Sequence, residues 1–139
     1  MEWYSQRWKI ETFHKVLKSG CKAEDAKLRT AERLTNLIAF FCIIAWRVFW
    51  LTMVHRTNPK TPVDAVFTET EIVILTHLAG DSQQAPKNVA HYLLIVDQLG
   101  GYLARKSDGP PGNVGIWRGL TSLTDIHLGV EVGKKLVGN

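Results

Sequence analysis

Residues 34–54 read LTNLIAFFCIIAWRVFWLTMV, and this apolar run decides how the chain folds. Nothing in the sequence breaks a helix from about residue 25 to about residue 55, so the run lies within one long helix. At its centre this helix is apolar on all sides, and its length is about that of a membrane span. Arg47 argues against a membrane, because a central arginine costs roughly 2.5–3.5 kcal/mol on insertion, and Asn36 and Thr52 add to that cost. We therefore predict a helix buried in the middle of a soluble helical bundle. A transmembrane helix stays the alternative.

Proline and glycine divide the remainder of the chain into further helices. The capping-box pair Thr68 and Glu71 marks one helix start. The predicted segments are a linker at 56–64, a helix from Thr68 to Gly80, a helix from Pro86 to Gly100, a polar loop at 102–115 and a last helix at 116–137.

The last predicted helix carries one apolar face at steps of three, four and seven residues. Gly129 and Gly133 lie one turn apart near the same side of this helix. Glycine costs a helix about 1 kcal/mol relative to alanine, so the pair needs a packing reason such as a closely approaching neighbour. That neighbour is either the rest of this chain or a second copy, and the sequence leaves both open.

The chain of 139 residues is long enough for one hydrophobic core, and its composition is that of a globular protein. Its net charge of +4 is unevenly spread. Residues 1–60 hold 11 Lys and Arg against 5 Asp and Glu, whereas residues 61–139 hold 6 against 8. The basic half favours a polyanionic partner, although charge alone does not choose between nucleic acid and anionic lipid.

The cysteines and histidines do not indicate a metal centre. Cys21 and Cys42 lack CxxC spacing, and the five histidines lack an HExxH-like pair, so we expect no structural zinc. Charged and aromatic residues follow Met1 at once, which does not fit a signal peptide. We expect a cytoplasmic protein, since the two cysteines fit a reducing compartment.

Residues 4–18, YSQRWKIETFHKVLK, form the first predicted helix, which ends at Gly20. At roughly 100° per residue, one stripe of this helix gathers a tyrosine, a carboxylate and three cations. These residues are Tyr4, Arg7, Glu11, Lys15 and Lys18. The opposite face holds Ile10, Phe13, Val16 and Leu17, which we expect to pack on the core. The stripe is explained either by solvated i,i+4 ion pairs or by contacts to phosphate and sugar.

The spacing Tyr4-x2-Arg7-x3-Glu11-x6-Lys18 resembles the Tyr-Arg-Glu-Lys signature of bacterial cut-and-paste transposases. The surrounding RWKIETFHK, and later LGGYLARK and IWRGL, resemble the transposon-five-like members of the insertion-sequence-four family. The similarity covers essentially the whole chain and is strongest in residues 3–20.

This resemblance implies a role in DNA chemistry for the charged stripe. In such transposases the motif helix belongs to a ribonuclease-H-like catalytic domain, in which three carboxylates hold two divalent ions that cut and join DNA. Glu11 matches the third carboxylate and so a metal ligand. Tyr4, Arg7 and Lys18 match residues that hold the transposon-end backbone, and Lys15 matches a further DNA contact. The implied ion is Mg²⁺, for which Mn²⁺ substitutes.

The two catalytic aspartates of the family lie upstream of this motif, and no aspartate of this chain can be assigned to those roles. The resemblance therefore implies a C-terminal portion that is inactive alone and needs no metal by itself. We expect a mainly α fold of about five helices. Residues 1–57 would be the closing helices of the catalytic domain, and residues 58–139 a helical dimerisation domain.

The expected function is that of part of a DNA transposase, with transposon-end and target DNA as partners and no membrane. We expect a homodimer through one row of the last helix: Leu123, Ile126, Val130, Gly133 and Val137. The alternative is a non-catalytic dimerisation module, or a decayed remnant, that inhibits active transposase by forming mixed dimers.

Overall fold

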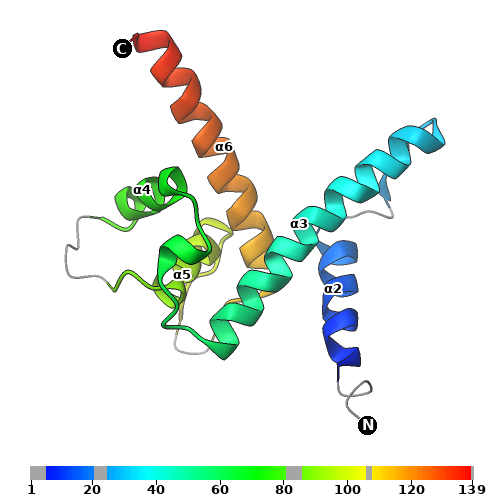
Figure 1. Cartoon of the computed structure of the whole chain (residues 1–139), viewed down its shortest axis with the longest axis horizontal. Coiled ribbons are helices and arrows are strands. Elements are labelled where there is room, and N and C mark those ends of the chain that lie inside the picture. Colours follow the sequence, from blue (N-terminus) through cyan, green and yellow to red (C-terminus); the bar gives the residue numbers. More distant parts are fainter. Residues whose placement is uncertain (1–5, 21–24, 81–85, 106–107, 139) are drawn as a thin grey trace.

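The computed structural model describes residues 6–20, 25–80, 86–105 and 108–138, and within them the chain is helical (Figure 1). The helices are α2 (Arg7–Ser19), α3 (Ala31–Thr57), the short 3₁₀ helix η2 (Val63–Ala65), α4 (Glu69–Leu78), α5 (Val89–Leu99) and α6 (Asn113–Val137). The prediction of a mainly α fold with five helices is confirmed. Polar side chains cap the starts of α3 and α5: the Thr30 side chain caps α3, and the Asn88 side chain caps α5. Asn88 Oδ1 accepts the His91 N–H at 3.0 Å, so α5 starts after Asn88 and not at the predicted Pro86.

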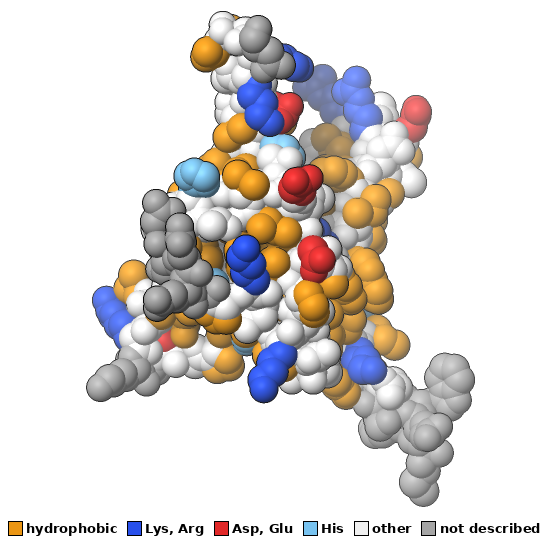
Figure 2. Space-filling view, turned by 60° about the vertical axis from the view of Figure 1, so that its left-hand side comes forward, with side chains coloured by type: hydrophobic (Ala, Val, Ile, Leu, Met, Phe, Trp, Pro, Cys, Tyr) orange, Lys and Arg blue, Asp and Glu red, His pale blue; other side chains and the backbone are white. Residues whose placement is uncertain are grey.

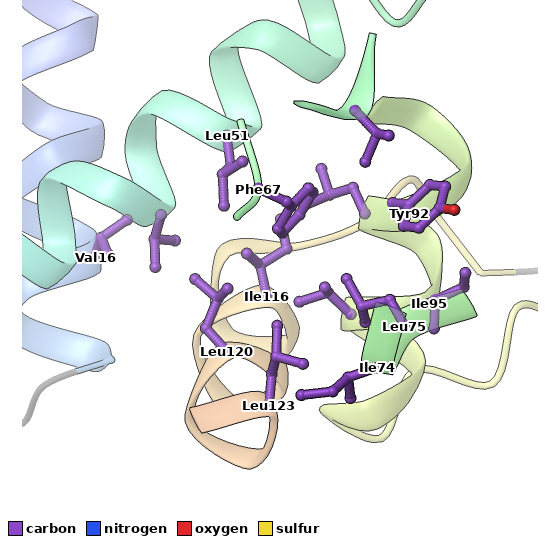
Figure 3. Packing of buried hydrophobic residues seen from close by; sticks show 14 of the residues in the cluster. Val16, Leu51, Phe67, Ile74, Leu75, Tyr92, Ile95, Ile116, Leu120 and Leu123 are labelled. Atoms are coloured by element: carbon purple, nitrogen blue, oxygen red, sulfur yellow. The ribbon is translucent and has the colours of Figure 1, made fainter. Parts of the chain in front are cut away.

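One hydrophobic core joins α3, α4, α5 and α6 (Figure 3). Leu51, Leu75 and Leu93 are fully buried and come from three different helices. Ile116 and Leu123 bring the first half of α6 into the same core. Helix α2 lies against α3 and α6 and joins the core through Val16, which is 1% exposed. One side of α2 therefore packs on the core, and the opposite side is exposed to solvent.

Helix α3 differs from the prediction of a helix surrounded by a bundle. Its buried residues lie between Ala45 and Thr52, and only 28% of its most apolar window is buried. Beyond these residues its N-terminal half projects past the other helices (Figure 1). The neighbours α5 and α6 do not cover it, because they meet α3 near its C-terminal half and α6 then runs away from α3 (Figure 1). The prediction of full burial is therefore wrong for the first half of α3.

The exposed part of α3 carries large apolar side chains, most of them along one side. Phe40, Ile43 and Trp46 are 58%, 69% and 58% exposed, and Ile38 and Trp50 are exposed as well. By length and composition α3 is the one helix in the described part of the chain that is long and apolar enough to cross a membrane.

Arg47, the residue that argued against a membrane span, is paired within the fold. Its Nη2 lies 2.8 and 2.9 Å from the two carboxylate oxygens of Glu71 on α4. Burial raises the pKa of Glu71, but the Thr68 N–H and the Arg47 guanidinium outweigh burial and hold the pKa below its usual value. Glu71 also completes the predicted capping box with Thr68, which is confirmed. A membrane-inserted α3 would have to give up this pair.

Glycines allow α5 and α6 to cross in close contact. A Cβ at Gly119 would lie 1.7 Å from the carbonyl oxygen of Val96, and a Cβ at Gly100 would lie 2.0 Å from that of Gly115. At Gly129 and Gly133, by contrast, a Cβ would meet nothing within 4 Å. The close packing predicted at this second pair is therefore not made by the described residues of the chain itself.

Candidate nucleic-acid interface and dimerisation surface

The charged stripe of α2 lies on its exposed side. Arg7, Glu11, Lys15 and Lys18 are all exposed, whereas Val16 on the opposite side is buried in the core. Phe13 and Leu17 pack against that core, as predicted. Ile10 does not: it is 61% exposed, because the first turns of α2 extend beyond the bundle (Figure 1). Tyr4 lies outside the described residues.

Arg7 and Glu11 form an ion pair along the helix. Arg7 Nε donates to Glu11 Oε1 at 2.9 Å, and the two side chains are 65% and 64% exposed. An exposed i,i+4 pair of this kind contributes only a few tenths of a kcal/mol. The pair agrees with the ion-pair explanation of the stripe, and the exposure of all four residues agrees with the phosphate-contact explanation.

A complete metal site is not present in the described part of the chain. No three His, Cys, Asp or Glu side chains there lie close enough together to hold an ion. Glu11 offers one solvent-facing carboxylate, whereas Mg²⁺ needs several oxygen ligands in octahedral geometry. The described residues therefore do not fit a metal centre by themselves, and Glu11 could supply no more than one of its ligands.

The row predicted for dimerisation runs along α6 from the core to the C-terminal end. Leu123 is 1% exposed and packs in the core of its own chain, and Ile126 packs partly against that core. Val130 is 37% exposed and Val137 is 86% exposed. Gly133 lies between them with its Cα side open. The outer end of the row is exposed and could contact a partner. Leu123, by contrast, is buried against the core of its own chain and is not exposed to a partner.

A groove lies where this row leaves the core, between α4 and α6. Its volume is about 560 Å³. Its lining is mostly apolar, with charged side chains among the lining residues: Glu69, Thr70, Val73, Ile74, His77, Leu78, Ile126, Val130 and Lys134. Figure 2 shows hydrophobic side chains at the surface below the end of α6, which projects at the top of that view.

Asp97 is a buried residue that the sequence did not single out. It is 1% exposed, neither carboxylate oxygen has a hydrogen-bond partner, and Oδ1 lies where a Cβ of Gly115 would be. Burial raises its pKa, and the nearby Gly112 N–H offsets this only in part. An aspartate on a helix usually predicts a solvated position, so no sequence signal marked its burial.

These features define a helical fold with a cationic helix face and an apolar helix end. Residues 43–135 match the family described as the Tn5 transposase dimerisation domain, and residues 1–47 match the transposase DDE domain. Since the first match covers more than half of the chain, the chain belongs to the Tn5 transposase dimerisation-domain family. The resemblance to transposon-five-like transposases is thereby confirmed.

The two matches meet inside α3, at residues 43–47. Helix α3 is continuous from Ala31 to Thr57, so the described structure has no break at this point. The division predicted between residues 57 and 58 stays a prediction.

A curated relative from Salinibacter ruber (strain DSM 13855 / M31) is described as phosphoenolpyruvate carboxykinase (ATP) 2. It is 30% identical over 83 residues, which are 59% of this chain and 16% of that protein. The chain thus spans less than a fifth of the length of this relative. A likeness confined to so small a part does not extend to the carboxykinase as a whole.

Proposed function

We propose that the chain acts as the C-terminal part of a cut-and-paste DNA transposase. It would contribute the third catalytic carboxylate, contacts to the transposon-end backbone, and a homodimer contact. The observation that carries this proposal is the exposed face of α2, where Arg7, Glu11, Lys15 and Lys18 lie together. The match of residues 1–47 to the transposase DDE domain supports it.

The cations of this face would hold phosphates of the DNA backbone. Arg7 presents a planar guanidinium, whose N–H groups suit phosphate oxygens, and Lys15 and Lys18 add positive charge about two and three turns further along. Such contacts position DNA without reading its sequence. Glu11 would face the same DNA, and in an intact enzyme it would add one carboxylate to the ligands of the divalent ions that the DDE domain implies, Mg²⁺ or Mn²⁺.

The exposed apolar side of α3 fits the same proposal. Phe40 and Ile43 lie in the part of the chain that matches the DDE domain, and an uncovered row of such side chains usually marks an interface. The rest of a DDE domain would cover this row in the intact transposase. The Arg47–Glu71 pair supports this over membrane insertion. We further propose that the protein acts in the bacterial cytoplasm.

A second candidate function is a non-catalytic dimerisation module that inhibits active transposase through mixed dimers. The match to the dimerisation domain covers residues 43–135, which is the larger part of the chain. A protein of this kind would keep the homodimer contact of α6 without cutting DNA.

Replacing Lys18 with Ala should weaken DNA binding equally for all sequences and lower the slope of log K against log salt by about one. The reason is that a phosphate contact releases about one counterion. The measurement is fluorescence anisotropy with duplex DNA at several salt concentrations, using a transposase that carries this chain. Lys9→Ala is the matched control, because Lys9 is exposed on the same helix but lies off the charged stripe. Equal slopes for both variants would mean that Lys18 does not contact phosphate and only forms part of a solvated helix face.

A further inference from the structure

The C-terminal end of α2 packs on the indole of Trp117 from α6. A Cβ at Gly20 would lie 3.3 and 3.4 Å from Cγ and Cδ2 of Trp117, so the backbone of Gly20 lies directly against the ring. A Cβ there would also lie 2.7 Å from the Val16 carbonyl oxygen, which accepts the Gly20 N–H at 2.8 Å. The missing Cβ of glycine therefore allows the end of α2 to come this close to α6.

This contact joins the two parts of the chain that match different families. Gly20 lies in residues 1–47, which match the transposase DDE domain, and Trp117 lies in residues 43–135, which match the dimerisation domain. The Trp117 ring is supported from behind, because it packs partly against the core that α6 shares with α3, α4 and α5. The ring is therefore a firm surface for the end of α2.

Helix α2 is held mainly through its C-terminal half. Phe13, Val16 and Leu17 pack on the core. Trp8 and Ile10, in the first turns, are 44% and 61% exposed. The N-terminal end of α2 accordingly points away from the bundle (Figure 1). The tilt of α2 is therefore set by the contacts at its C-terminal end, and the Gly20–Trp117 contact is the last of these.

A small change of tilt at the held end displaces the residues at the other end of α2. At a rise of about 1.5 Å per residue, Glu11 lies about 13 Å along the helix from Gly20, so a tilt of about 10° would move Glu11 by about 2 Å. Mg²⁺ requires near-ideal octahedral geometry, and a misplacement of about 1 Å can cost about a hundredfold in rate. The flexible side chains of Lys15 and Lys18, by contrast, adapt to such a shift by rotation.

We propose that Trp117 is a positioning residue that fixes the tilt of α2 and thereby the position of the Glu11 carboxylate. This inference rests on the proposed function, in which Glu11 supplies a ligand to the divalent ions of an intact transposase. Trp117 acts through the backbone of Gly20 and needs no contact with DNA or metal. It makes the chemistry at α2 depend on the correct packing of α6.

Replacing Trp117 with Leu should lower the cleavage rate of a transposase that carries this chain about 100-fold, because the end of α2 loses the ring on which it packs. The Kd for transposon-end DNA should change far less, since the cationic side chains adapt. Trp117→Phe should recover most of the rate, because it restores an aromatic ring beside Gly20. The measurements are single-turnover cleavage of end-bearing DNA in Mg²⁺ and fluorescence anisotropy, with circular dichroism to monitor the fold.

Ile72→Ala is the matched control, because Ile72 also packs partly on the core but lies on α4. It should lower the stability of the fold without lowering the cleavage rate of the folded protein. Hydrogen exchange of the whole chain gives a readout that does not depend on activity: Trp117→Leu should speed the exchange of α2 amides, and Ile72→Ala should not. If Trp117→Leu does not fold, Gly20→Ala tests the same contact, because its Cβ would push the end of α2 away from the ring and should likewise slow cleavage.

The failure of this inference can be told apart from the failure of the proposed function. Wild-type cleavage by a folded Trp117→Leu variant, beside an inactive Glu11→Gln variant, would overturn the role of Trp117 and keep the proposed function. Equal losses of DNA binding and cleavage, or an equal loss of cleavage in Ile72→Ala, would reduce Trp117 to a residue that only stabilises the fold. Wild-type cleavage by Glu11→Gln would overturn the proposed function instead. Unchanged exchange of the α2 amides in Trp117→Leu would in every case overturn the positioning of α2 by Trp117.

Discussion

Replacing Glu11 with Gln should abolish Mg²⁺-dependent cleavage of transposon-end DNA by a transposase that carries this chain with the rest of its DDE domain. Gln keeps the size and helix preference of Glu but removes the negative charge and one carboxylate oxygen. Even residues that only support a metal ligand cost about 10–100-fold when they are removed, so a ligand itself should cost at least about a hundredfold. DNA binding should stay close to normal, because the cations of the stripe are unchanged.

The ion-pair explanation of the stripe predicts a different result for the same variant. Losing the exposed bond from Arg7 would cost only a few tenths of a kcal/mol and leave cleavage unchanged. The measurement is cleavage of end-bearing DNA in Mg²⁺ and in Mn²⁺, beside anisotropy for end binding. Glu32→Gln is the control, since Glu32 is an exposed glutamate in the first turn of α3. Cleavage near the wild-type rate by the Glu11 variant would remove Glu11 from the catalytic assignment.

Replacing Gly119 with Ala should destabilise the fold by about 3 kcal/mol. The added Cβ would lie 1.7 Å from the Val96 carbonyl oxygen and 2.9 Å from Val96 Cγ1, so α5 and α6 would have to move apart. A backbone carbonyl cannot change its rotamer to make room, as a flexible side chain can. The core between these helices would therefore lose its packing. The measurement is urea unfolding at several protein concentrations, followed by circular dichroism.

Gly133→Ala is the matched control on the same helix, and its effect should have the opposite sign for the monomer. A Cβ there meets nothing within 4 Å of the chain, so the variant should gain up to about 1 kcal/mol of helix stability. An unfolding free energy for Gly119→Ala within about 1 kcal/mol of wild type would contradict the close crossing of α5 and α6.

Local patterns predicted the helices well because their causes are local. The capping box of Thr68 and Glu71 depends on residues three positions apart, and the structure has it as predicted. The periodicity of residues 4–18 likewise placed Val16 in the core and the cations outside. The starts of α5 and α6 differ from the predicted starts by a few residues, because the N-cap positions Asn88 and Gly112 were not recognised from the sequence.

Features that depend on contacts between distant segments were not predicted. The sequence could not tell that α3 has neighbours along only half of its length, since an apolar run looks the same whether it is covered or not. Close helix packing was predicted at Gly129 and Gly133 from their spacing, whereas in the structure Gly100 and Gly119 lie at the close crossing of α5 and α6. The partner of Arg47 comes from another helix, 24 residues away in sequence. For the same reason, the roles of Glu11 and the stripe cations stay predictions that only DNA chemistry can test.

The proposed homodimer can be tested by the mass of the chain in solution. Sedimentation equilibrium of the whole chain gives its mass in solution without any choice of DNA or metal. We predict a species of twice the chain mass of 15.7 kDa, which dissociates on dilution. A single species of 15.7 kDa at concentrations up to about 100 µM, where even a weak dimer of this kind would form, would contradict it.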